Sequence, residues 1–357
     1  MKNHSERKAL MNRYVIWFVI ALQLGALGFI AGKREWIRFN GEVVYLRTAP
    51  VDPRDLFRGD YVQLEYDLAF PSREIMDKYF NENKITADSR LKQQTVYLWL
   101  NSSRQRAPEL VQLSLVEPLE GPFMKAQIGG NEWSQRAPIQ LGIEKYFVEQ
   151  GAGLALEEKR GKRNDWQTAM EMEVALGSDG TAVIKGHRWS DLAVRIEVVV
   201  PADRRTRRSE TDEEDENARR SPVLKVSLRN QSVQVVNLLV SETNFCEFQL
   251  LKLEDARLLK GYETIEFPNR DCANFGNGSF IVKSLAPDAT HVMEVDLANP
   301  DWFVRYKDRI MEISDMPGNR SGFRWIYSAS EIKKDDIENL WQSQIKTASF
   351  RASGFID

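Results

Sequence analysis

One uncharged stretch near the N-terminus constrains what this chain can fold into more than any other feature. Residues 14–32, YVIWFVIALQLGALGFIAG, span 19 positions without a charged side chain. An α-helix rises about 1.5 Å per residue, so a helix of this length matches the ~30 Å hydrocarbon layer of a bilayer. We therefore predict one transmembrane helix, preceded by a short tail, within residues 1–33.

A cleaved signal peptide is the alternative to such an anchor. The apolar region of a signal peptide usually runs about 7 to 15 residues, which is shorter than this stretch. The cleavage pattern that the stretch offers is a weak one, at Ala26-Leu27-Gly28. An uncleaved anchor in the lipid bilayer is therefore the prediction.

The basic residues that flank the span do not decide its orientation by number. Those before it are Lys2, Arg7, Lys8 and Arg13, and those after it are Lys33, Arg34, Arg38 and Arg47. Long domains cross a membrane largely regardless of charge, whereas a short basic tail resists crossing. We therefore predict a cytoplasmic N-terminus, with the bulk of the chain periplasmic or extracytoplasmic.

The rest of the chain has the composition of a folded globular protein. Of 357 residues, 42% are hydrophobic and 28% are charged, and the net charge is −3. Without a basic excess, binding to nucleic acid is not indicated. His4, His187 and His291 lie far in sequence from one another and from both cysteines, so we expect no metal site, and no motif indicates a cofactor.

The two cysteines, Cys246 and Cys272, leave two readings open. In an oxidising compartment they would permit one disulfide. Two buried free thiols are the alternative.

Alternating apolar and polar residues predict a β-rich domain over residues 34–201. Residues 41–49 and 61–68 read as strands, while residues 71–85 read as a helical or irregular excursion. The apolar face of the second strand carries Val62, Leu64, Tyr66 and Leu68. Ser178-Asp179-Gly180 separates two further strands and is a strong hairpin signal.

Residues 202–221 predict a break in the chain. They are rich in arginine and acidic residues and hold almost no apolar side chains, so they cannot contribute to a core. A solvated linker is the prediction, and a charged docking segment is the alternative.

Residues 222–329 repeat short strands about ten residues apart, a spacing typical of a small β-sandwich of immunoglobulin-like form. Residues 330–357 predict a helix and a tail. Ser330 is a suitable N-cap for that helix, and the apolar residues that follow are Ile332, Ile337, Leu340, Trp341 and Ile345. The expected fold is therefore mainly β, with one helix at each end of the chain.

The stretch DPRDLFRGDYVQLEY, residues 52–66, is the most specific motif. Its opening Asp-Pro pair predicts a turn, because the aspartate bonds the backbone ahead and proline fixes φ. Gly59 permits a positive φ before the next strand, and Asp60 can accept hydrogen bonds from Arg54 or Arg58. A rigid structural corner is the favoured interpretation over a catalytic centre.

This stretch resembles the hallmark of the GDYXXLXY family of membrane-anchored bacterial proteins, whose molecular function is unassigned. A second similar segment, residues 143–158, carries the pattern Y-F-V-x-x-G-x-G, with Glu149 where a proline is often seen. The resemblance covers about residues 14–200. The positions taken as motif or binding candidates are Asp52, Pro53, Arg54, Asp55, Arg58, Gly59, Asp60, Tyr61, Leu64, Tyr66, Tyr146, Phe147, Gly151, Gly153 and Glu157.

The sequence gives little support to an enzymatic function. A Gly-Asp pair beyond a membrane anchor is similar to the S-M-x-P-T-L-x-x-G-D motif of type I signal peptidases, but Val51 occupies the position of the nucleophilic serine. The carboxylates of Asp52, Asp55 and Asp60 could form an acid–base pair of the glycosidase kind. Neighbouring arginines lower the pKa of such carboxylates, which suits salt bridges better than a general acid.

The leading hypothesis is a non-enzymatic, single-pass envelope protein whose first β-domain binds another integral membrane protein. The alternative is an envelope-polymer hydrolase or carbohydrate-binding protein that uses Asp55 or Asp60. Its stacking platform would be Trp302, Trp325 and Phe323, although aromatic residues at such positions more often belong to a core.

Overall fold

The structure of the protein is a computed structural model. The structure describes residues 2–51, 61–84, 94–103, 106–128, 139–149, 152–161, 165–199, 221–241, 245–255, 260–272, 280–316, 322–328 and 337–351.

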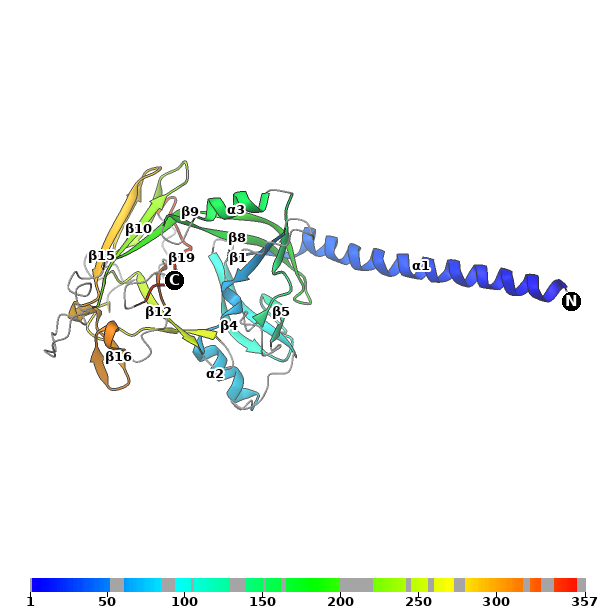
Figure 1. Ribbon diagram of the computed structural model, residues 1–357, viewed down its shortest axis with the longest axis horizontal. Coiled ribbons are helices and arrows are strands. Elements are labelled where there is room, and N and C mark those ends of the chain that lie inside the picture. The colour runs from blue at the N-terminus through cyan, green and yellow to red at the C-terminus, as the bar shows by residue number, and fades with distance from the viewer. Residues whose placement is uncertain are drawn as a thin grey trace, which may run out of the picture.

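Helix α1, Lys2–Asn40, projects away from a β-rich body (Figure 1). Its part Val15–Asn40 is long and apolar enough to cross a membrane, judged by length and composition, and none of the apolar 18-residue window within it is buried against the body. The predicted N-terminal apolar helix is therefore confirmed. A signal sequence would pass the same test, so the topology stays a prediction.

The largest sheet has seven strands in the order β15-β10-β9-β8-β1-β2-β7, and every neighbouring pair is antiparallel. Its strands are β1 Glu42–Val51, β2 Tyr61–Tyr66, β7 Lys145–Phe147, β8 Gln167–Leu176, β9 Ala182–Val199, β10 Val223–Asn230 and β15 Thr290–Asp296. The predicted hairpin forms between β8 and β9, where Gly180 adopts a φ of 74° that favours glycine.

A second sheet completes the N-terminal part, in the order β4-β3-β5-β6. Its strands are β3 Gln94–Ser103, β4 Arg106–Ser114, β5 Phe123–Ile128 and β6 Ile139–Gln140. The alternation predicted for the second strand is confirmed at Val62, Leu64 and Tyr66, which are buried on β2. Leu68 is buried too, but it lies in the 3-10 turn that follows β2. They share one core with β1, β3, β5 and β8.

Two helices lie on this part of the body (Figure 1). Helix α2, Arg73–Glu82, falls within the stretch predicted to be helical or irregular. Ser72 caps it, because its hydroxyl oxygen accepts a hydrogen bond from the amide of Ile75. Helix α3, Ala152–Arg160, begins within the second family-like segment, residues 143–158.

The C-terminal part adds smaller antiparallel sheets. They contain β11 Val236–Val240 with β14 Ile281–Leu285, β16 Val304–Tyr306 with β17 Arg309–Met311, and the series β13-β12-β18-β19. The strands of that series are β12 Phe248–Asp255, β13 Lys260–Thr264, β18 Phe323–Ser328 and β19 Gln344–Lys346. Short 3-10 turns at Asp67–Ala69, Pro300–Trp302 and Ile313–Asp315 complete the connections.

Strand β9 joins the two parts. Its first half pairs with β8, and its second half pairs with β10, on the other side of the charged stretch 202–221. Leu192, Val194 and Ile196 of β9 lie in the C-terminal core. Two cores therefore share one sheet, and the immunoglobulin-like form predicted for residues 222–329 is not confirmed. The division into domains stays a prediction.

The helix predicted from Ser330 is wrong where the structure describes that segment. Residues 337–340 form a turn, and Gln344–Lys346 form strand β19, which pairs with β18. The amide of Trp341 donates to the carbonyl of Asn237, so long-range pairing takes backbone groups that a helix would use locally. Ile337, Trp341 and Ile345 are four residues apart, a spacing that also places side chains on one face of a strand.

Candidate functional site

Of the family motif, residues 52–66, the structure describes Tyr61–Tyr66, which form β2. Asp52, Pro53, Arg54, Asp55, Arg58, Gly59 and Asp60 fall outside the described residues, between Val51 and Tyr61. Strand β1 leaves α1 at Gly41 and has ten residues. At about 3.4 Å per residue, its last residue, Val51, lies roughly 30 Å from the end of the helix.

Two motif positions on β2 are architectural. Leu64 and Tyr66 point into the core, and the amide of Leu64 donates to the carbonyl of Glu144 at 2.7 Å. The Tyr66 hydroxyl donates to the carbonyl of Ile143 at 2.9 Å. Burial of this phenol, with a smaller contribution from Glu144, raises the pKa of Tyr66 well above its ordinary value, so the hydroxyl stays protonated. Both residues therefore fix β2 against the segment before β7.

The second family-like segment packs beside the same strand. Tyr61 begins β2 opposite Phe147, whose side chain is largely exposed on the short edge strand β7. A Cβ on Gly153 would lie 3.7 Å from a methyl of Val62, an ordinary contact, so α3 covers this end of β2. Gly151 and the side chains of Tyr61 and Glu157 lie outside the described part of the chain.

Tyr146 contacts a histidine on β9. Its hydroxyl lies 3.2 Å from Nδ1 of His187, and the imidazole meets the ring of Trp189 edge-on. Burial lowers the pKa of His187, and the ammonium of Lys159 acts in the same direction. The neutral imidazole can accept a hydrogen bond from the tyrosine, so this group is a polar contact within the fold.

The sequence reasoning missed a row of charged residues across β1, β8 and β9. Arg47 stands opposite Glu171, and Glu171 stands opposite Arg188. The side chains of Arg47 and Glu171 are only 7% and 5% exposed. A buried charge is costly unless it is paired and hydrogen-bonded, so each partner matters here.

The C-terminal segment supplies hydrogen bonds to Arg47. The two terminal guanidinium nitrogens of Arg47 donate to Oε1 of Gln344 at 2.9 Å and to Oγ of Ser343 at 3.0 Å. The carboxylates of Asp67 and Glu171 each lie 3.8 Å from the guanidinium. Arg47 on β1 is thereby joined to the segment around β19, almost 300 residues later in the chain.

Glu171 is fully engaged. One carboxylate oxygen accepts from Nε of Arg188 at 2.7 Å, and the other accepts from the hydroxyl of Ser343 at 3.1 Å. The guanidinium of Arg188 lies 3.5 Å from the centre of the Tyr45 ring, which is a cation–π contact.

Asp67 and Lys346 form the other end of this network, with 2.9 Å between the ammonium and the carboxylate. Burial alone would raise the pKa of Asp67, but Lys346 and Arg47 together outweigh it and hold that pKa below its ordinary value. We name the six side chains of Arg47, Asp67, Glu171, Arg188, Ser343 and Lys346 the junction network.

Two cavities flank the junction network. The larger, of about 770 Å³, is lined by Glu171, Arg188, Trp189, Ser190, Asp191, residues 232–236, Ile337 and residues 339–343. We name it the junction cleft. The smaller, of about 350 Å³, includes Arg47, Asp67 and Lys346 in its lining. Val233, which is 91% exposed, stands at the edge of the junction cleft.

The aromatic platform of the carbohydrate alternative is contradicted. Phe323, Trp325 and Trp302 are 0%, 1% and 6% exposed. Trp325 packs against Trp302 and Phe248, with ring centres 5.2 and 5.6 Å apart. These rings form the C-terminal core, so none of them can stack on a sugar.

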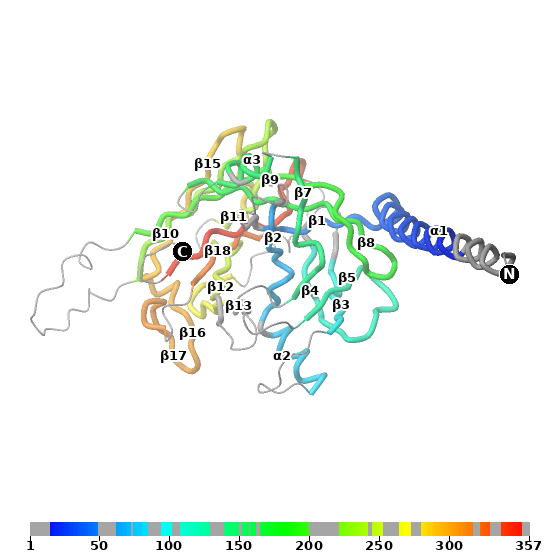
Figure 2. Tube along the Cα trace, turned by 45° about the vertical axis from the view of Figure 1, so that its right-hand side comes forward, coloured from blue at the N-terminus to red at the C-terminus, as the bar shows by residue number. Residues whose placement is uncertain are grey.

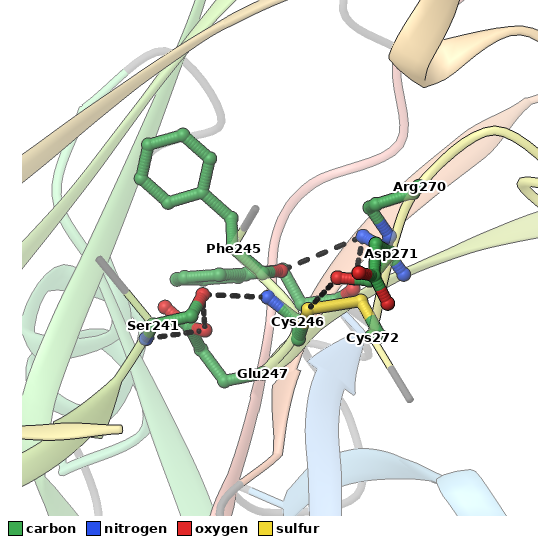
Figure 3. Close-up of a disulfide and its surroundings, with 8 residues drawn as sticks. Ser241, Phe245, Cys246, Glu247, Arg270, Asp271 and Cys272 are labelled. Carbon is green, nitrogen blue, oxygen red and sulfur yellow. Dashed lines mark hydrogen bonds between the residues drawn. A yellow bond between two sulfur atoms is a disulfide. The ribbon is translucent and has the colours of Figure 1, made fainter. Parts of the chain in front are cut away.

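Cys246 and Cys272 form a disulfide (Figure 3). Beside it, a carboxylate oxygen of Glu247 accepts from the amide and the hydroxyl of Ser241. Burial raises the pKa of Glu247, although these hydrogen bonds oppose the rise. Arg270 donates to the carbonyl of Phe248 at 2.9 Å and so ties this corner to β12.

Comparison with protein-family models matches residues 23–186 to a family described as GDYXXLXY protein. No curated protein and no solved structure matches the chain. The matched range begins within α1 and ends within β9, so it contains Arg47, Asp67 and Glu171 but not Ser343 or Lys346.

Proposed function

Because residues 23–186 belong to the GDYXXLXY protein family, we propose that the protein is a single-pass envelope protein anchored by α1. In this proposal, it binds another integral membrane protein and does not catalyse a reaction. The exposed apolar surface of α1 supports the anchor. The disulfide supports an oxidising compartment outside the cytoplasm. The binding surface that we propose is the junction cleft.

The observation that carries this proposal is the state of the carboxylate in the junction cleft. A general acid or base needs a proton site that faces the reacting group. Both oxygens of Glu171 are instead occupied by Arg188 and Ser343, and the guanidinium of Arg47 lies beside the same carboxylate. The arrangement therefore favours recognition over hydrolysis.

The lining of the junction cleft suits a protein partner. Val233 and Val235 present apolar side chains from the connection between β10 and β11. Hydroxyl and amide side chains on the neighbouring walls supply hydrogen-bonding groups. An apolar contact surrounded by polar groups is the usual composition of a protein interface.

A photoreactive amino acid placed at Val233 or Val235 in intact membranes tests this proposal. We expect both positions to give the same crosslinked membrane protein. Ile310, a partly exposed residue of β17 on a hairpin away from the junction cleft, is the control position and should give none. Adding Val233→Glu to the Val235 probe should weaken the crosslink, because a charge in an apolar contact is costly. Equal labelling from all positions would contradict the proposal.

A carbohydrate partner is the second candidate, because Trp189 and several hydroxyl and amide side chains line the junction cleft. An indole face among such groups also suits a sugar ring. Full-length protein in detergent can be tested for binding to purified cell-wall glycan, with Trp189→Ala as the comparison. Binding that Trp189→Ala abolishes would favour the carbohydrate partner.

The hydrolase alternative through Asp55 or Asp60 stays a prediction, since both residues lie outside the described part of the chain. It requires that the purified protein release fragments from envelope polymers and that Asp55→Asn or Asp60→Asn stop the release. Under our proposal, neither the parent chain nor these variants release fragments.

A further inference from the structure

An exposed apolar loop, residues 115–122, connects β4 to β5. Leu119 is 99% exposed and Val116 is 74% exposed, and Leu115 adds further apolar surface. A single exposed apolar residue is unremarkable, but adjacent ones at one end of a molecule indicate a contact surface.

The contacts around the loop place it beside the end of α1. Lys33 of α1 binds Asp179 at the tip of the β8–β9 hairpin, with 2.6 Å between the ammonium and the carboxylate. At the same tip, the carbonyl of Gly180 accepts a hydrogen bond from the amide of Lys125 at 2.8 Å. Lys125 belongs to β5, the strand that the loop enters. The loop is therefore connected to α1 through the hairpin tip.

A cavity of about 620 Å³ confirms this proximity, because Lys33 and Trp36 of α1 line it together with residues 119–123. In Figures 1 and 2, β5 lies at the end of the body from which α1 projects. The loop and the exit of α1 thus lie on the same side of the body.

The same contacts set the height of the loop relative to a bilayer. Lys33 directly follows the uncharged stretch 14–32, so it marks the surface of the bilayer if α1 spans it. Trp36 and Phe39, which are 69% and 80% exposed, follow at the depth where aromatic side chains favour the membrane interface. Ile37, where the helix enters the body, lies only about 6 Å beyond Lys33.

We propose that loop 115–122 is a second membrane contact, which places Val116 and Leu119 in the interfacial layer of the bilayer beside α1. This inference rests on the proposed anchor. Glu117 and Glu120 alternate with the apolar side chains and can remain at headgroup level, where Lys33, Arg34 and Arg38 offset their charge. When both α1 and the loop contact the bilayer, the tilt of the body relative to the bilayer is fixed. Contact through α1 alone leaves this tilt free.

Depth-dependent fluorescence quenching in proteoliposomes tests the inference with the full-length chain. Both native cysteines lie in the disulfide, so an introduced cysteine can be labelled under non-reducing conditions. Three single variants carry an environment-sensitive dye: Leu119→Cys in the loop, Phe29→Cys in α1 and Ile310→Cys on the β16–β17 hairpin. That hairpin lies at the opposite end of the body in both views (Figures 1 and 2). The vesicles contain phosphatidylethanolamine and phosphatidylglycerol with a nitroxide shallow on the acyl chain.

We expect lipid quenching at position 119 to exceed that at position 310 by about threefold, as for a side chain within the interface. Quenching at position 29 together with equal, low quenching at positions 119 and 310 would overturn the inference and leave the anchor intact. Absence of quenching at position 29 would overturn the anchor and the inference together.

A second labelling scheme separates membrane contact by the loop from insertion driven by the dye. The dye is placed at Glu120→Cys, first in the parent chain and then together with Val116→Ser and Leu119→Ser. Lipid quenching should fall by about half or more in the double-serine background, because the apolar side chains that hold the loop in the interface are gone. Unchanged quenching would contradict the inference. A blue-shifted emission without lipid quenching would also contradict it, because it indicates that protein, and not lipid, covers the loop.

Discussion

Arg47 shows how a single residue connects distant parts of this chain. On β1 it occupies the face opposite the one that Leu46 presents to the N-terminal core, where sequence alternation indicates a solvated side chain. The structure instead buries it beneath Ser343 and Gln344. No local pattern reveals partners so remote in sequence, so the strand could be predicted from the sequence but the junction network could not.

Removing the charge of Glu171 should destabilise the fold strongly. Glu171→Gln leaves Arg47 and Arg188 without their shared carboxylate, and loss of one partner from a buried pair costs about 3 to 5 kcal/mol. Glu173→Gln is the matched control, because Glu173 lies on the same face of β8 and pairs with Lys185 at 3.2 Å but is one-third exposed. We expect it to cost less than about 1 kcal/mol. Denaturant titration of the full chain in detergent measures both values, and equal losses would contradict a special role for Glu171.

The pair of Asp67 and Lys346 should make stability depend on acid pH. The folded protein holds the pKa of Asp67 below its ordinary value of 3.8. Ionised Asp67 therefore contributes stability that is present above pH ~4 and is lost as the pH falls through the lowered pKa. Thermal unfolding of the full chain between pH 7 and pH 3 should show a steeper acid loss than in Asp67→Asn. Parallel curves for the two chains would refute this contribution.

At the scale of elements, a sequence pattern predicted the structure correctly where its spacing fits only a helix or only a strand. It failed where the spacing fits both. Strand β2 alternates over consecutive residues, which only an extended chain can bury on one face, and it was predicted correctly. The β8–β9 turn was predicted because Gly180 provides the backbone conformation that the hairpin needs. The segment around Trp341 and Ile345 was misread, because a spacing of four fits a helix and a strand alike.

The disulfide should stabilise the segment that carries β12 and β13. It closes a loop between residues 26 apart, joining the start of β12 to the turn after Phe267. Closing a loop of this length is worth about 3 kcal/mol in the chain-entropy account. We expect the variant with Cys246→Ala and Cys272→Ala to lose a free energy of unfolding of this order in denaturant titration. A single Cys246→Ala variant controls for the exposed thiol, and a double variant as stable as the parent would refute the expectation.

At the scale of the whole molecule, the family-matched part and the C-terminal part are joined by strand pairing and by side-chain contacts. They have separate cores, but β9 contributes to the shared sheet on both sides and the junction network spans the boundary. Residues 202–220 lie outside the described part of the chain, so the solvated linker predicted from their charged composition stays a prediction. The pairing of β10 with β9 could not be predicted, because strand pairing over a long connection leaves no local signal.

This shared construction predicts that the body unfolds in one cooperative transition. Leu46→Ala opens a cavity in the N-terminal core and Leu250→Ala opens one in the C-terminal core, at side chains that are 1% and 0% exposed. Each should cost about 3 kcal/mol. If β9 and the junction network couple the cores, each variant shifts the whole denaturant transition of the full chain, whether it is followed by tryptophan fluorescence or by hydrogen exchange in β3 and β18. Independent domains would instead give two transitions, with Leu46→Ala moving only the exchange in β3 and Leu250→Ala only that in β18.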